Sequence, residues 1–310
     1  MAVLGDYIRI KHGFAFKGDY ITADDNGVVL VTPGNFEIGG GFKEKKCKFF
    51  SAEYPEEYVL QAGDLIVTMT DLSKQGDTLG YGALVPESSR TYLHNQRIGL
   101  VEVFNPEADK NYIYWFMRTP RYQKTVVATA SGSTVKHTSP SRICAVEVDF
   151  PPIDEQRQVV SILDAMEQKI QNNNRINDNL LKQAQTLFEQ RFIFDDIEGN
   201  EKPLYDFADY INGAAFKPNE CGEYGLPIIK IVELKNGITN STKYFDGFKG
   251  EKYLVQNKDI LFSWSGNPDT SIDVFIWTHG NAILNQHTFN VKSNTGHRWF
   301  TFLMLILITN

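Results

Sequence analysis

The sequence predicts an α/β (α+β) protein in which two strand-rich domains of the same fold are separated by one long helix. Three observations predict this arrangement. Segments of the first 150 residues recur in the same order after residue 202. The recurring segments are short, rich in β-branched and aromatic residues, and bounded by Gly, Asn and Asp, as strands are. Between the copies, Pro151-Pro152 precedes a stretch in which apolar residues recur every 3.5 positions, as in a coiled coil.

Four pairs of segments carry the internal repeat. Their offset falls from 200 residues (12 to 212) to 190 residues (93 to 283), as different loop lengths would produce. Four matches in one order indicate two copies of one domain. We therefore predict domains at residues 1–150 and 196–310, joined by a helix at 151–195. The matched pairs are "HGFAFKGDY" (His12–Tyr20) with "NGAAFKPNE" (Asn212–Glu220), "GVVLVTPGNFEIGG" (Gly27–Gly40) with "GLPIIKIVELKNGI" (Gly225–Ile238), "GDLIVTMT" (Gly63–Thr70) with "KDILFSWS" (Lys258–Ser265), and "LHNQRIGLVEV" (Leu93–Val103) with "ILNQHTFNVKS" (Ile283–Ser293).

Within the first copy, the expected elements are several strands and one helical region. The runs "VVLVT", "DLIVTMT", "IGLVEV" and "ICAVEVDF" predict strands, the last of them over Ile143–Phe150. A helix is expected over "NYIYWFMRTPRYQKTVVATA", with a break near Pro120, because proline removes a backbone donor. In the second copy, "WFTFLMLILI" (Trp299–Ile308) has about half the length that crosses a bilayer, which predicts a core element.

The second copy is shorter than the first. After Gln96 the first copy continues for 54 residues to Phe150 (150 − 96), whereas 24 residues follow Gln286 (310 − 286). The missing 30 residues (54 − 24) correspond to the loop at Gly132 and the strand after it. We therefore expect the second domain to be incomplete and a second long helix to be absent.

The segment from Val159 onward has the pattern of a coiled-coil helix. Its seam positions are spaced alternately by four and three residues, and about forty residues of helix would extend roughly 60 Å. One domain cannot cover so long a helix, so its seam is expected to pack against another helix. Two Asn in the seam would fix its register, unless Asn172–Asn174 is simply an exposed weak point. The predicted helix-pairing seam comprises Val159, Leu163, Met166, Ile170, Asn173, Asn177, Leu180, Ala184 and Leu187.

The chain is acidic overall but locally basic. A net charge of −7 argues against a generic nucleic-acid binder, so any DNA contact must come from local charge. From Asn111 to Val146 there is no Asp or Glu, and "KEKKCK" at Lys43–Lys48 is a second basic cluster. Either cluster could be a solvated face, and the first is more informative because it ends in the loop "GSTVKHTSPS". Its basic residues are Arg118, Arg121, Lys124, Lys136, His137 and Arg142.

The sequence contains no recognisable catalytic or metal-binding motif. Its three cysteines are far apart without a CxxC pair, which favours a reducing cytoplasm and argues against a zinc site. The histidines have no HExxH spacing, and there is neither a P-loop nor a GxSxG elbow. "NPDT" at Asn267 resembles an amino-methyltransferase motif only superficially, since no cofactor-binding glycine loop precedes it. We expect no catalysis, metal, cofactor or membrane association in this chain itself.

Polar loops at strand ends are the recurring feature instead. They follow "GDLIVTMT" and its repeat, contain the repeated Asn-Gln pair, and close the first copy in "SGSTVKHTSPS". Asn and Gln can read adenine and Arg and Lys guanine, while Ser and Thr suit phosphates. The repeated Asn-Gln pairs could equally bond backbone at a strand start. The candidate DNA-binding residues are Ser73, Lys74, Gln75, Asn95, Gln96, Arg97, Ser133, Thr134, Lys136, His137, Asn267, Asn285, Gln286 and His287.

The chain resembles the specificity subunits of Type I restriction-modification systems. The segment Gly132–Phe192 is similar to the part that closes a target-recognition domain and opens the spacer helix in that family. "GFAFK", "GAAFK", "GDLIVTMT" and the Asn-Gln pairs fit the same family, so the resemblance covers nearly the whole chain. The matching pieces are Gly132-Ser133-Thr134, Pro151-Pro152, Glu155-Gln156, Ile162-Leu163, Ile170, Asn177, Leu180 and Ala184-Gln185.

This resemblance implies a non-catalytic subunit that recognises double-stranded DNA. In the family, two target-recognition domains each read half of a bipartite site, and two antiparallel helices hold them at a fixed distance. The helices dock methyltransferase subunits, and motor-nuclease subunits join that core, so S-adenosylmethionine, ATP and Mg²⁺ are expected on partner subunits. Because the second domain looks incomplete, residues 1–195 are expected to homodimerise through the helix and read a symmetric site.

Three alternatives stay open at this point. The chain could be a truncated decoy that binds methyltransferase subunits without directing them. It could be the recognition factor of another phage-defence system, or a coiled-coil scaffold without DNA contact. Co-purification with a methyltransferase subunit would separate the scaffold from the others, and methylome sequencing would separate a decoy from a reader.

Overall fold

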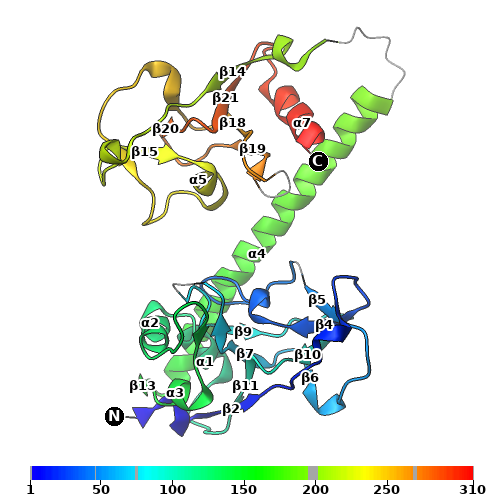
Figure 1. Cartoon of the computed structure of the whole chain (residues 1–310), viewed down its shortest axis with the longest axis vertical. Helices are drawn as coiled ribbons and strands as arrows, with labels where there is room; N and C mark the ends of the chain where they lie inside the picture. The colour runs from blue at the N-terminus through cyan, green and yellow to red at the C-terminus, as the bar shows by residue number, and fades with distance from the viewer. Residues whose placement is uncertain (1, 46, 74–75, 195–201, 268–270, 310) are drawn as a thin grey trace. The chain divides into compact units, whose positions relative to one another are not determined.

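The computed structural model describes residues 2–45, 47–73, 76–194, 202–267 and 271–309. Figure 1 shows strand-rich regions before and after one long helix in the chain, which confirms the predicted fold class. The chain divides into two units, Met1–Asn172 and Asn173–Asn310. This division falls within the long helix, so the domain boundaries at residues 150 and 195 stay predictions.

The first unit contains two main sheets of short strands. An antiparallel sheet has the order β2-β11-β7-β9, and a second sheet has the order β3-β5-β4-β10-β6 with β4 and β10 parallel. Short antiparallel pairs join β1 to β13 and β8 to β12. The predicted strands in "VVLVT", "DLIVTMT" and "IGLVEV" are confirmed as β4, β7 and β11. The bounds are β1 Ala2–Val3, β2 Ile8–His12, β3 Ile21–Thr22, β4 Val28–Val31, β5 Lys48–Phe50, β6 Val59–Leu60, β7 Leu65–Thr68, β8 Thr70–Asp71, β9 Gly82–Leu84, β10 Thr91–His94, β11 Ile98–Val103, β12 Lys136–His137 and β13 Glu147–Val148.

Two helices follow β11, and local sequence signals explain where each begins. Helix α1 (Lys110–Phe116) begins after Asp109, whose carboxylate accepts two backbone N–H groups of the first turn. Helix α2 (Pro120–Ala128) begins after Thr119 and has proline at its first position, where a helix needs no backbone donor. The predicted helical region is confirmed, together with its break at Pro120.

The predicted strand over Ile143–Phe150 is wrong for most of its length. Its first residues close helix α3 (Pro140–Cys144), and β13 is the only strand within that range. Ser139 explains the difference, because its hydroxyl accepts the N–H of Arg142 while Pro140 sets the first helical turn. The apolar alternation in the sequence therefore comes from a helical turn followed by a very short strand.

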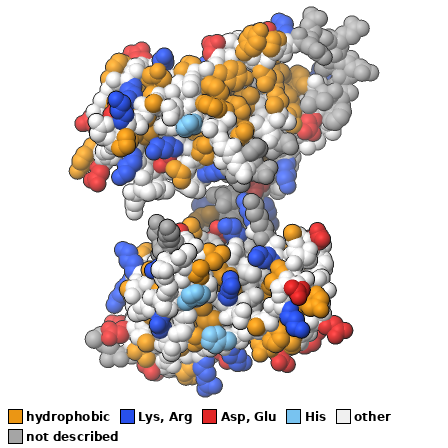
Figure 2. Space-filling view, viewed as in Figure 1, with side chains coloured by type: hydrophobic (Ala, Val, Ile, Leu, Met, Phe, Trp, Pro, Cys, Tyr) orange, Lys and Arg blue, Asp and Glu red, His pale blue; other side chains and the backbone are white. Residues whose placement is uncertain are grey.

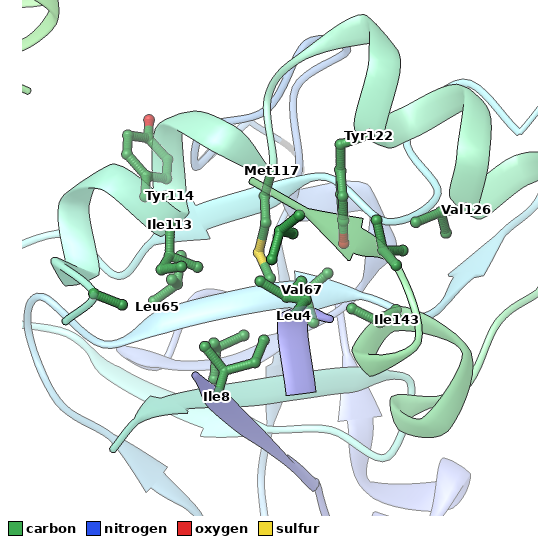
Figure 3. Close-up of a cluster of buried hydrophobic side chains, with 14 of the residues drawn as sticks. Leu4, Ile8, Leu65, Val67, Ile113, Tyr114, Met117, Tyr122, Val126 and Ile143 are labelled. Atoms are coloured by element: carbon green, nitrogen blue, oxygen red, sulfur yellow. The ribbon is translucent and has the colours of Figure 1, made fainter. Parts of the chain in front are cut away.

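Strand β7 is buried on both of its faces. Leu65 and Val67 belong to a core with α1, α2 and α3, and Ile66 belongs to a second core with the other sheet. Figure 3 shows Tyr122 of α2 and Ile143 of α3 pointing toward Val67 and Leu4, and Ile113 of α1 beside Leu65. Burial of these apolar side chains is the main stabilising contribution to the unit. The loops that follow β7 therefore start from a firmly held strand.

The second unit repeats the strand orders of the first. Its sheets β14-β21-β18-β19 and β16-β15-β20-β17 correspond strand by strand to β2-β11-β7-β9 and β5-β4-β10-β6, including the parallel pair β15 and β20. The internal repeat is therefore present in the topology. The bounds are β14 Ala208–Asn212, β15 Leu226–Ile229, β16 Tyr244–Phe245, β17 Leu254–Val255, β18 Ile260–Ser263, β19 Asp273–Ile276, β20 Ala282–Leu284, β21 Thr288–Ser293, α5 Ile231–Asn236 and α7 Arg298–Thr309.

Helix α7 contains the apolar run near residue 300. Leu305 and Ile306 are buried against the sheet that contains β18 and β21, which confirms the predicted core element. Within the described residues, the structure has no helix that is both long and apolar enough to cross a membrane.

The long helix is α4 (Ile153–Glu189), which continues into a π-helical turn at Gln190–Phe194. Its 37 residues correspond to about 56 Å of helix. Asp154 and Glu155 lie in its first turn, where acids favour a helix. Most seam positions are open to solvent, so their pairing with another helix stays a prediction. Val159, Met166, Ile170, Asn173, Asn177, Leu180 and Leu187 are exposed, and Leu163 and Ala184 are partly buried.

Candidate nucleic-acid interface

Three polar segments of the first unit converge around the end of strand β7. They are the β7–β9 loop (residues 69–81), the β10–β11 turn (Asn95–Arg97) and the β12 loop (residues 131–138). The backbone N–H of Met69 donates to the Arg97 carbonyl, and the N–H of Thr138 donates to the Met69 carbonyl, both at 3.0 Å. Strand β8 in the first loop also pairs with β12 in the third. The structure therefore brings together three segments that the sequence indicated separately.

Asp71 organises the β7–β9 loop from inside. The residue is 4% exposed, and its carboxylate accepts the backbone N–H of Ser73 at 2.6 Å and the hydroxyl of Thr78 at 2.7 Å. Burial alone would raise the pKa of Asp71, but the hydrogen bonds from Thr78 and Ser73 outweigh it and hold that pKa below its ordinary value. The Ser73 hydroxyl accepts the N–H groups of Gly76 and Asp77. Ser73, a predicted DNA contact, therefore also holds the loop.

Asp71→Asn is expected to destabilise the first unit by about 2–3 kcal/mol at pH 7, because an amide cannot accept all of these hydrogen bonds. The folded pKa lies below the unfolded value of about 3.9, so the carboxylate stabilises the fold above that pH and this stabilisation is lost as the pH falls through the folded pKa. Hydrogen exchange of first-unit peptides measures the difference between wild type and variant. A difference that grows below pH 4 would contradict this assignment.

The β12 loop presents its polar residues beside that loop. Ser133, Thr134 and His137 are exposed, and Lys136 is partly buried. The Nδ1 atom of His137 lies 3.2 Å from the Thr70 hydroxyl on β8. Arg142, in helix α3, is exposed and donates from its guanidinium to the Ser131 hydroxyl of this loop at 3.2 Å.

Gly132 is required by the backbone of the β12 loop. Its φ is +92°, and a Cβ at this position would lie 2.0 Å from the carbonyl oxygen of Val135. The "GST" sequence therefore combines a structural glycine with two exposed hydroxyls.

The repeated Asn-Gln pairs have a structural component in both copies. A Cβ on Gly13 would lie 2.3 Å from the Asn95 carbonyl oxygen, and one on Gly213 would lie 2.2 Å from the Asn285 carbonyl oxygen. The Asn95 side chain accepts the N–H of Arg97, and Asn285 is 8% exposed. The structure thus shows a backbone contact of the Asn95 side chain and places Asn285 in a buried position. Of the other predicted residues in these turns, Gln96, Arg97, Gln286 and His287 are exposed.

In the second unit, Trp264 is a residue that the sequence interpretation missed. It aligns with Met69 in the repeat, is 39% exposed, stacks on Phe289 and donates to the Asn212 side chain. The sequence could have indicated this residue, because Trp264 lies in the repeated segment "KDILFSWS" just before a predicted polar loop. Asn267 is exposed in the loop that follows. Two other predicted residues, Lys74 and Gln75, lie outside the described residues.

Arg118 of the acid-free window is not part of this interface. Its guanidinium lies over the ring of Trp115 at 4.5 Å, donates to the Gly39 carbonyl, and approaches Glu167 on α4 at 3.5 Å. This basic residue of the window is therefore paired with an acid from a distant part of the sequence. In the view of Figure 2, basic and acidic side chains are interspersed over the first unit.

A sequence model described as the Type I restriction modification DNA specificity domain matches residues 2–182. The chain belongs to this family. The match includes the three converging segments of the interface and most of α4. The resemblance stated from the sequence is therefore confirmed: residues 2–182 form a Type I DNA specificity domain.

Individual relatives agree with the family match. The chain is 30% identical over 158 residues to the Type I restriction enzyme EcoBI specificity subunit of Escherichia coli, covering 51% of this chain and 30% of that protein. It is 27% identical over 95 residues to the MjaIX specificity subunit of Methanocaldococcus jannaschii, covering 31% and 22%. The alignments thus span less than a third of these relatives.

A solved structure supports the fold. The Type I restriction-modification S subunit from M. genitalium aligns with a TM-score of 0.54 and 14% identity, covering 98% of this chain and 75% of that chain.

Within the described residues, no group of three or more His, Cys, Asp or Glu could hold a metal ion.

Proposed function

We propose that this chain is the DNA-recognition subunit of a Type I restriction-modification complex, in which its first unit reads one half of a bipartite site. The observation that supports this most is the convergence of the β7–β9 loop, the β10–β11 turn and the β12 loop beside strand β7. Specific recognition needs base-reading side chains on a rigid support together with phosphate contacts that set position. A strand buried on both faces provides such a support.

Within the interface, the exposed side chains divide by chemistry. Gln96 and Arg97 have the groups that read adenine and guanine edges, and His137 also offers a ring nitrogen. Ser133 and Thr134 suit phosphate oxygens. In the second unit, Asn267, Gln286 and His287 are the exposed candidates for the other half-site.

Helix α4 is proposed to set the distance between half-sites and to dock partner subunits. Its exposed apolar seam would pair with a like helix, including one from a second copy of the chain, and methyltransferase subunits would bind alongside. Motor-nuclease subunits would join that core. Catalysis, with S-adenosylmethionine, ATP and Mg²⁺, would then belong to the partner subunits.

Lys136→Ala is expected to weaken DNA binding at every sequence and to reduce the slope of log K against log salt by about 1, if its ammonium contacts a phosphate. Fluorescence anisotropy over a range of salt concentrations measures both quantities. Lys169→Ala on the exposed part of α4 is the matched control and should change neither. An unchanged slope with one base position made degenerate would assign Lys136 to base reading instead.

Co-expression with the methyltransferase subunit tests the proposal as a whole. The expected result is that the two proteins co-purify and that their complex retards duplex DNA containing the target. Co-purification without DNA binding would identify a decoy. Absence of any methyltransferase association would contradict the proposal and favour a recognition factor of another defence system or a scaffold.

A further inference from the structure

The internal repeat places the same aromatic pair in both units. In the first unit, the rings of Phe16 and Phe50 lie 4.9 Å apart at 69°. In the second unit, the corresponding rings of Phe216 and Phe245 lie 5.2 Å apart at 71°. Both pairs join the segment after the first long strand of a unit to a short strand of its second sheet. The two sites can therefore be compared position by position.

In the second unit, a lysine occupies this aromatic pair. The Nζ atom of Lys249 lies 5.0 Å from the centroid of Phe216 and 5.5 Å from that of Phe245. It also lies 2.8 Å from the carboxylate of Glu220. An ammonium over two ring faces and beside one acid is a cation–π arrangement. The second copy thus binds a cation from its own chain.

In the first unit, neither the lysine nor the acid is present at the matching positions. The segments "KFFSAEY" (Lys48–Tyr54) and "KYFDGFK" (Lys243–Lys249) align without a gap, which places Tyr54 at the position of Lys249. "FKGDY" and "FKPNE" align in the same way, which places Tyr20 at the position of Glu220. Among the described residues of this unit, no Lys or Arg is recorded over Phe16 or Phe50.

An open pocket takes the place of the bound lysine. Its volume is about 630 Å³, and Phe14 and Tyr20 on its wall are 39% and 45% exposed. Five aromatic residues line it, together with Glu53, an acid that can supply the counter-charge. The aromatic lining residues are Phe14, Phe16, Tyr20, Phe50 and Tyr54.

We propose that this aromatic pocket binds a lysine side chain of a partner polypeptide. Ring faces attract ammonium groups, and several rings together make a cage that is selective for such cations. Lys17 also lines the pocket, but Lys217 occupies the same position in the second copy, where Lys249 binds nonetheless. This site adds to the proposed function a contact with a partner protein, and that contact does not depend on the reading of DNA bases.

A titration of the whole chain tests the chemistry of the pocket. Saturation-transfer NMR is carried out with Nα-acetyl-lysine methylamide and with its neutral norleucine analogue. The lysine derivative is expected to bind saturably, and the norleucine analogue about fivefold or more weakly, as the loss of about 1 kcal/mol of cation–π attraction predicts. Equal binding of both compounds, or no saturable binding, would overturn the proposal.

Two variants assign the binding to this pocket. Tyr20→Glu combined with Tyr54→Lys rebuilds the arrangement of the second copy, so the introduced lysine should fill the pocket and abolish probe binding with the thermal transition retained. Lys249→Ala should conversely open a second site and double the stoichiometry. Unchanged binding in the double variant would overturn the assignment. Tighter binding of putrescine than of the lysine derivative, or displacement of the derivative by duplex DNA, would exclude a partner lysine as the ligand.

Discussion

Gln156→Leu is expected to destabilise the first unit by about 3–5 kcal/mol, the largest effect of any single substitution considered for this chain. The Gln156 side chain is 0% exposed. Its carbonyl oxygen accepts the N–H of Asp109 at 2.9 Å, and its amide donates to the carbonyls of Glu107 and Pro151, both at 2.8 Å. Leucine would fill the space but leave three partly buried backbone groups without these partners, each costing about 1–3 kcal/mol.

Hydrogen exchange of peptides that cover α1 and the first turns of α4 measures this effect. Gln158→Leu is the matched control, because Gln158 is exposed two positions away on the same helix and should change stability by less than about 0.5 kcal/mol. Equal protection in both variants would show that Gln156 does not tie α4 to the recognition unit. Loss of protection confined to the Gln156 variant would confirm that it does.

Met166→Glu combined with Ile170→Glu is expected to weaken pairing of α4 by at least about a hundredfold, because two carboxylates would enter an apolar seam. Both side chains are more than half exposed in the chain, at 58% and 56%, so folding itself should be unaffected. Analytical ultracentrifugation at micromolar concentration measures the association. Lys182→Glu is the charge-changing control, since Lys182 is exposed and lies outside the seam.

A wild-type chain that sediments strictly as a monomer would contradict the prediction that the chain forms a homodimer. The same pair of variants then tests pairing with a helix of another subunit, by co-purification with the methyltransferase. Retention of association in the double variant would contradict the assignment of this seam as the pairing surface.

The sequence predicted the strands and the long helix, because these elements follow from the local pattern of apolar and polar residues. The repeated segments predicted matching strand orders because hydrophobic alternation and turn residues are both local properties, and the topology reproduces them. The heptad spacing predicted α4 in the same way. The strand prediction for Ile143–Phe150 was wrong because a short apolar alternation does not distinguish a capped helical turn from a strand. Ser139 caps the helical turn that forms there instead.

The site was harder to predict because its contacts join residues that are distant in sequence. Arg118 lies in a window without acids, yet Glu167, 49 positions later (167 − 118), lies beside it in the fold. Asp71 was not among the predicted site residues, yet its carboxylate holds Ser73 and Thr78 in place. The aromatic pocket at Phe16 and Phe50 also went unnoticed, since the two rings belong to segments on either side of β3 and β4.

The most direct test of the central claim, that the loops of the first unit select a DNA sequence, is methylome sequencing of a host that expresses the methyltransferase subunit with and without this chain. We predict that the chain adds a methylated motif and that Arg97→Ala makes one position of that motif degenerate, at a discrimination cost of about 1–3 kcal/mol. The same methylated motifs with and without the chain would contradict the account.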